Sequence, residues 1–185
     1  MPDRILTRAD LNERNEYAAS DSLHVDGSLA IPAELGTVYF RGSVTVQNNI
    51  TIGASINAKY DIDAGWGIEV GRDITAGQSI TAGRDITAVD GIEAGGGITA
   101  EGSIATSGRI VTAGRITAGR DIIAGWRITA RKSITAGWHI SAGGGITAGN
   151  DVSAKFDIYA TDKVIRCRRL VSGTVAYGTL IEEGR

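Results

Sequence analysis

Aliphatic residues recur at every sixth position from Val38 to Leu170, which makes 23 consecutive units of six residues without an insertion or deletion. The consensus unit reads Ile-Thr-Ala-Gly-x-x, and Ala fills the third position in 15 of the 23 units. This alternation predicts a short β-strand in which Ile and Ala point to one side and Thr to the other. A period of six does not fit an α-helix, because aliphatic residues six apart would spiral around its axis.

The fourth position is Gly in 12 of the units, and we expect this glycine to supply a left-handed backbone at a sharp corner. Each unit is then one strand followed by one corner. Three units close a triangular coil of about 18 residues, in which each strand pairs in parallel with the strand three units further on. The predicted fold class is all-β, a single-stranded parallel β-solenoid of about 7–8 coils and roughly 37 Å in length at ~4.8 Å per coil.

The segments outside residues 38–175 do not follow this pattern, and we interpret them as caps. Residues 1–37 form an N-terminal cap with a short polar helix over residues 7–19 and an irregular first coil, and residues 176–185 form a C-terminal cap or tail. The N-terminal cap has a net charge of −4, whereas the other end carries a basic rim of Lys163, Arg166, Arg168 and Arg169. Opposite charges at the two ends favour head-to-tail stacking of rods. The alternative is that both ends are simply exposed to solvent and their charges have no role in assembly.

Sorting the units in threes places large side chains along one corner of the coils. This predicted partner-binding edge consists of Trp66, Arg84, Arg120, Trp138 and Phe156. Exposed Trp and Arg are typical hot-spot residues of protein interfaces, so we expect a protein partner or a second copy of the chain to bind there. The alternative is that the aromatic rings lie over the glycine corners of neighbouring coils.

The column beside this edge contains Asp121, His139 and Asp157, which are residue types found in metal sites and as catalytic bases. Ligands on one straight edge at steps of ~4.8 Å converge poorly on a single ion. Alternating charges along a solvated edge explain the column as well. We therefore expect no metal, no cofactor and no catalytic residue.

A ladder of threonines stands on one face of the expected solenoid, one residue per coil, at Thr81, Thr99, Thr117 and Thr135. Such a ladder is similar to the surfaces of ice-binding β-solenoids. Recognition of ice or of a polymer surface is therefore one alternative function. Thr is also a preferred outward residue of strands, which explains the ladder without any ligand.

Composition narrows the class of protein further. The chain has 26 Gly but only 2 Pro, which excludes collagen. A net charge of −2 argues against a nucleic-acid binder that works by phosphate neutralisation. There is no apolar run of ~18 residues and no signal-like apolar core at the start, so we expect a cytoplasmic protein without a membrane partner. The single cysteine, Cys167, rules out an internal disulfide, and we place it at a corner among basic residues that would lower its pKa.

Over about residues 38–175 the units resemble those of hexapeptide-repeat parallel β-helix proteins and of bactofilins, which are β-helical polymer-forming scaffolds. Hexapeptide acyltransferases use the order aliphatic-Gly-x-x-small-x. Here the order is reversed, because Ile74 precedes Ala76 and Gly77 follows it. The coils also lack the interrupting loop that those enzymes usually carry. The resemblance implies a non-catalytic structural or protein-interaction module, with self-association as one of its expected properties and an acyltransferase-like enzyme as a further alternative.

Overall fold

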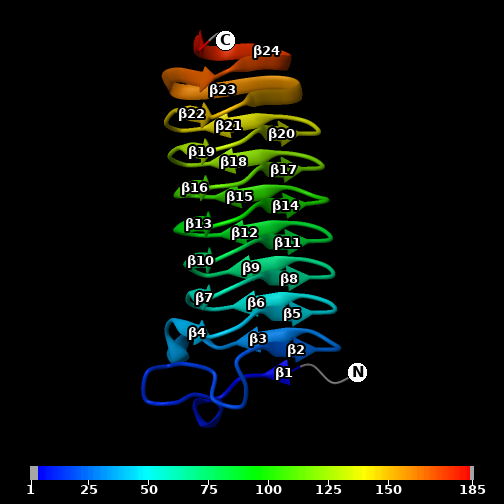
Figure 1. Ribbon diagram of the computed structural model, residues 1–185, viewed down its shortest axis with the longest axis vertical. Coiled ribbons are helices and arrows are strands. Elements are labelled where there is room, and N and C mark those ends of the chain that lie inside the picture. Colours follow the sequence, from blue (N-terminus) through cyan, green and yellow to red (C-terminus); the bar gives the residue numbers. More distant parts are fainter. Residues whose placement is uncertain (1–3, 184–185) are drawn as a thin grey trace.

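The computed structural model describes residues 4–183, apart from the side chains of residues 162–163 and 172–173. The chain winds into a rod of about nine coils whose strands form one parallel sheet, with β1 at one end and β24 at the other (Figure 1). The parallel β-solenoid expected from the repeat is therefore confirmed, but with about nine coils in place of the expected 7–8. Within residues 4–183, no helix has the length and apolar character needed to cross a membrane.

From β2 to β20 each strand pairs with the strand three places later in the chain, which divides the rod into three faces. Face 1 contains β2 (Leu23–Val25), β5 (Val44–Val46), β8 (Ile62–Ala64), β11 (Ile80–Ala82), β14 (Ile98–Ala100), β17 (Ile116–Ala118) and β20 (Ile134–Ala136). Face 2 contains β3 (Leu29–Ile31), β6 (Ile50–Ile52), β9 (Ile68–Val70), β12 (Ile86–Ala88), β15 (Ile104–Thr106), β18 (Ile122–Ala124) and β21 (Ile140–Ala142). Face 3 contains β4 (Val38–Phe40), β7 (Ile56–Ala58), β10 (Asp73–Ala76), β13 (Gly91–Ala94), β16 (Arg109–Thr112), β19 (Ile128–Ala130) and β22 (Ile146–Ala148).

The core is a stack of identical layers, because the strands stay in register from coil to coil. Ile116, for example, lies between Ile98 and Ile134 in the neighbouring strands, and all three are fully buried. The alanines two residues later are also buried, whereas the residue between each pair points outward. Each coil thus buries the open side of the coil before it, and the core continues along the whole rod.

The corner glycines have a different role from the one expected. Among the described glycines only Gly36 and Gly178 have a positive φ, of 68° and 126°, so the prediction of left-handed corners is wrong. A Cβ at Gly83 or Gly119 would overlap the carbonyl oxygen of the residue one coil below. Glycine is needed at these corners because the coils stack so closely, and not because the backbone is left-handed.

The N-terminal segment contributes a further coil and a small cap. Leu23 pairs with Val44, a longer step than in the later coils, because the 3-10 turn η2 (Ala33–Leu35) adds three residues to this coil. Below it, β1 (Arg4–Ile5) pairs with β3. Residues 7–19 contain the single 3-10 turn η1 (Arg8–Asp10) and not the expected helix. Leu11 and Tyr17 are both buried, and residues six apart could not share one face of a helix.

The C-terminal end breaks the repeat in a way that the sequence phase did not indicate. The long strand β23 (Asp151–Cys167) continues around the coil and pairs with β24 (Arg169–Glu182). Ile146 pairs with Ile165 and not with Val164, so Ile165 is buried and Val164 is exposed. The expected inward position of Val164 is therefore wrong by one residue. The same shift turns Cys167 into the core, where its side chain is 1% exposed.

Candidate interaction edge

The five residues predicted to form an edge lie in one column, at the corner that joins face 1 to face 2. With Gly102 they make up what we call the Trp–Arg edge, which consists of Trp66, Arg84, Gly102, Arg120, Trp138 and Phe156. The backbone amide of each residue donates a hydrogen bond to the carbonyl of the residue one coil below, at distances between 2.9 and 3.0 Å from Arg84 to Phe156. The column is thus held in register by the same ladder that holds the strands.

The aromatic rings of this edge are covered by cationic side chains. The guanidinium of Arg84 lies 4.8 Å from the ring centre of Trp66, and that of Arg120 lies 5.5 Å from the ring centre of Trp138. Such contacts between cation and ring hold both side chains in place at the surface. The two tryptophans remain 48% and 44% exposed, so a large part of each ring is open to a partner.

The two arginines lean in opposite directions along the rod, because Trp66 and Trp138 lie on opposite sides of Gly102. A hollow lies between them, and it is lined by Gly83, Arg84, Asp85, Glu101, Gly102 and Arg120. A Cβ on Gly102 would overlap Asp85 Oδ1, which accepts a hydrogen bond from the Ser103 amide at 2.7 Å, and it would lie 3.0 Å from the carbonyl carbon of Arg84. The centre of the Trp–Arg edge is therefore a gap that contains two carboxylates.

The neighbouring column of Asp121, His139 and Asp157 is a chain of hydrogen bonds and stacking contacts. The amide of His139 donates to Asp121 Oδ1 at 3.1 Å, and its Nδ1 lies 3.0 Å from the same oxygen. The imidazole stacks on Phe156 with ring centres 5.4 Å apart, whereas Asp157 accepts a hydrogen bond from the Tyr159 hydroxyl at 3.1 Å. Within residues 4–183, no group of three His, Cys, Asp or Glu side chains is placed to hold a metal ion.

The basic rim is partly neutralised where the structure describes it. Arg166 pairs with Glu183 at 3.2 Å, and Arg169 pairs with Asp151 at 3.5 Å. Arg168 is exposed, and the side chain of Lys163 lies outside the described residues. Our sequence reasoning missed that this rim continues down one corner of the rod. A hollow at that corner is lined by Arg115, Ser133, Asn150, Asp151, Arg168 and Arg169, and sorting the residues by coil would have found four of them.

The threonine ladder is in register, as Thr81, Thr99, Thr117 and Thr135 pair one after another along face 1. The residues on either side of each threonine are buried, so the ladder is a single rank of hydroxyls. Thr117 is less exposed than the other three.

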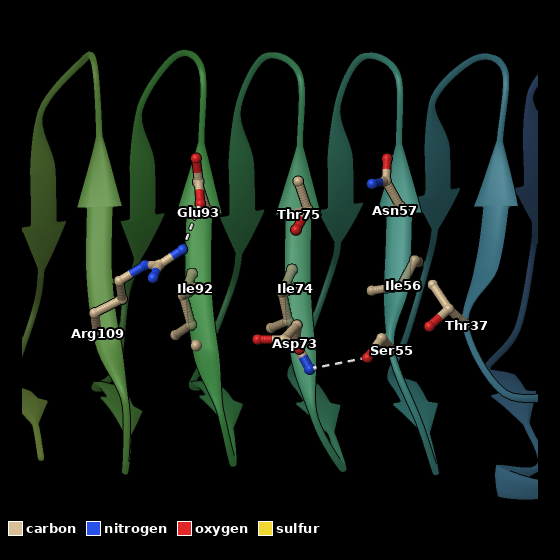
Figure 2. A pocket seen from close by; sticks show the side chains of 11 residues that line it. Thr37, Ser55, Ile56, Asn57, Asp73, Ile74, Thr75, Ile92, Glu93 and Arg109 are labelled. Carbon is tan, nitrogen blue, oxygen red and sulfur yellow. Dashed lines mark hydrogen bonds and ion pairs between the residues drawn. The ribbon is translucent and has the colours of Figure 1, made fainter.

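Two further surface features lie away from this edge. Trp126, at another corner, is 71% exposed beside a hollow formed by Gly143, Gly144 and Gly145. Figure 2 shows a polar hollow on face 3, where Arg109 pairs with Glu93 at 3.3 Å and the amide of Asp73 donates to Ser55 Oγ. Both features are shallow and follow the repeat of the coils.

Cys167 does not have the chemistry expected of a corner cysteine. Burial is the main cause that raises the pKa of its thiol, and the carboxylate of Glu182 adds to the effect. The expectation that neighbouring arginines lower this pKa is therefore wrong, because the side chain points into the core. A buried thiol with a raised pKa is a poor nucleophile.

Comparisons of the chain with models of protein families, with curated proteins and with solved structures find no match. What the chain does must therefore be argued from the geometry of its own surface.

Proposed function

We propose that this protein is a structural or protein-interaction module, a stiff rod that presents the Trp–Arg edge to a protein partner. The observation that carries the proposal is the arrangement of that edge. Three half-exposed aromatic rings and two arginines stand in one line and are fixed in register by backbone hydrogen bonds. Trp and Arg are the residue types most enriched among interface hot spots, and an edge that is already ordered loses little entropy on binding.

The architecture supports the same proposal. The strands of successive coils are joined by short corners from β4 to β22, so the surface repeats at one coil spacing over most of the rod. A scaffold of this kind offers an extended surface that changes little in shape on binding. The rod itself also agrees with the resemblance to polymer-forming bactofilins, which is a reason to include a second copy of the chain among the candidate partners.

Photo-crosslinking in the cells that produce the protein tests this proposal. A benzophenone amino acid is placed at Trp66 or Trp138, and at Thr87 on face 2 as a matched control. We expect protein adducts at the two edge positions and none at Thr87, since only the edge is expected to contact a partner. Edge positions that give no more adducts than Thr87 would contradict the proposed role of the edge.

A further inference from the structure

The order of residues along the Trp–Arg edge is complementary to itself when it is read in the opposite direction. We propose that this edge binds the same edge of a second copy, with the two rods antiparallel and the two-fold axis between the coils of Gly102 and Arg120. This inference rests on the proposed function and names the partner of that same site. In a two-fold interface each contact occurs twice, so every residue must suit its opposite number.

The Trp–Arg edge satisfies this requirement at all six of its positions. Arg120 faces Gly102 of the second copy, which leaves room for its long side chain. Arg84 faces Trp138 of the second copy, so that indole keeps a cation beside it when its own Arg120 enters the hollow. Trp66 faces Phe156 of the second copy, and two aromatic rings are a favourable pair at an interface centre.

The hollow at Gly102 provides charge complementarity at the centre of this arrangement. Asp85 and Glu101 line it, and the chain's own two arginines are turned away toward the tryptophans. Glu101 is exposed and has no ion pair within the described residues. On dimerisation Arg120 of the second copy would turn from its own Trp138 to these two carboxylates, so each copy supplies a cation and receives one.

The column beside the edge is complementary in the same arrangement. Asp85 faces His139 of the second copy, Ser103 faces Asp121, and Gly67 faces Asp157. These pairs join unlike or neutral groups, and no carboxylate meets another. The Trp–Arg edge and the column beside it are therefore both complementary with the two-fold axis in the same position.

Other arrangements bring like charges together or lose contacts. Parallel rods would place Arg84 and Arg120 against their own copies. An antiparallel pair with its axis through Gly102 itself would place Arg84 against Arg120, and Asp85 against Asp121. Like charges placed directly opposite each other are destabilising. Moving the two-fold axis by one whole coil avoids these like-charge pairs. Trp66 or Phe156 then has no residue of the second copy's edge opposite it.

The size of the edge sets the expected strength. Trp66 and Phe156 are separated by five coils, which is about 24 Å at ~4.8 Å per coil. The edge is only one corner wide, so the buried area is below that of standard interfaces at ~800 Å² per partner. We expect a dimer that forms reversibly, with a Kd of about 1 μM or weaker.

Cysteine crosslinking tests the orientation of the two rods. Cys167→Ala removes the native thiol at an inward position where Ala is the consensus residue. Gly67→Cys and Asp157→Cys are then made singly in that background. A Cβ at Gly67 would lie 3.4 Å from Asn49 Oδ1, an ordinary contact, so the substitution fits. We expect a short bis-maleimide to link the two variants when they are mixed, and neither variant to itself. Self-linking of Gly67→Cys, or no link in the mixture, would overturn the antiparallel arrangement.

Charge reversal tests the central contact by an independent measurement. Arg120→Glu and Glu101→Arg should each weaken dimerisation by roughly tenfold in sedimentation velocity, because each brings like charges together. The two substitutions in one chain should restore part of the dimer, since the contact between positions 120 and 101 is then reversed while Asp85 is unchanged. A double variant that dimerises no better than the single variants would overturn the proposal, and Glu69→Arg on face 2 is the matched control.

Failure of this inference and failure of the proposed function give different results. A chain that stays monomeric up to about 1 mM, but forms edge-specific adducts with a foreign protein, refutes the dimer and keeps the interaction edge. A chain that neither dimerises nor forms edge-specific adducts refutes both.

Discussion

The inward position of Ile116 leads to the sharpest test of the fold. Ile116 is fully buried between Ile98 and Ile134, whereas Thr117, one residue later, points outward. We expect Ile116→Asp to unfold the coils around it and Thr117→Asp to leave the rod folded. The outward position already accepts this residue type, because Asp63 occupies the same rank of face 1 one coil before Thr81.

The magnitude follows from burial. Removing most of a buried Ile side chain costs about 2–5 kcal/mol, since the surrounding layers cannot collapse onto the cavity. Introducing a carboxyl group without a hydrogen-bond partner adds further kilocalories, whether it stays charged or becomes protonated. The total is comparable with the about 5–15 kcal/mol that stabilises a whole domain. Thr117→Asp lies at the surface and should change stability by about 0.5 kcal/mol or less.

Circular dichroism during urea unfolding measures both variants. The Ile116→Asp protein should begin to unfold at much lower urea than the wild type, and it should show a separate transition because repeat arrays do not always unfold in one step. The Thr117→Asp protein should follow the wild-type curve. If the two variants had equal curves, or if Thr117→Asp were the less stable, the assignment of inward and outward positions would be refuted.

Two further predictions concern a corner and a titrating group. Gly119→Ala should lower the free energy of unfolding by about 1–3 kcal/mol, because its Cβ would overlap the carbonyl oxygen of Glu101; calorimetry that shows a gain in stability would contradict the close stacking of the coils. The pKa of Asp63 is raised, first by burial and also by the nearby charge of Asp61, so its favourable contribution is present in acid and lost as the pH rises through the folded pKa. Asp63→Asn should therefore be more stable than the wild type at neutral pH and equal to it in acid, and equal urea midpoints at both pH values would refute this.

The repeat predicted the coils in the middle of the rod, because their fold depends on only the Ile, Ala and corner positions of each unit. The phase of Ile and Ala indicated strand, register and core at once, and it is kept without interruption from Val44 to Ala148. At the ends other groups complete the core. Leu23 and Leu29 belong to a coil that three extra residues separate from the rest, and a slip of one residue turns Cys167 inward. Counting in sixes cannot detect the extra residues or the one-residue slip. Both depend on which side chain covers the exposed core at the end of the rod.

The sequence also could not predict why glycine is needed at the corners. Frequent glycine is consistent with either a left-handed backbone or a close approach of two chains, and only the position of the carbonyl one coil below separates the two. The same holds for the Trp–Arg edge. Sorting the units in threes placed its members in one column, but the sequence did not show that Arg84 and Arg120 turn away from Gly102 and open a hollow between them.

Folding of a solenoid restricts the residues of its core more than those of its surface. The residues of the Trp–Arg edge are therefore informative about function. Stacking of the coils requires the Ile and Ala positions and, at many corners, a glycine, whereas the corner residue that follows is solvent-exposed along most of the rod. At that position the sequence has Gly102 in one coil, Arg84 and Arg120 on either side of it, and Trp66 and Trp138 beyond them. Only Gly102 is constrained by its neighbours, because a Cβ there would overlap Asp85 Oδ1. Folding does not require Trp or Arg at the other positions, because those coils would stack as well with a small polar residue. An exposed Trp instead exposes apolar surface to water, which proteins seldom tolerate in a line without a partner. The fold alone does not explain the order along the edge, whereas the proposed binding of a partner does.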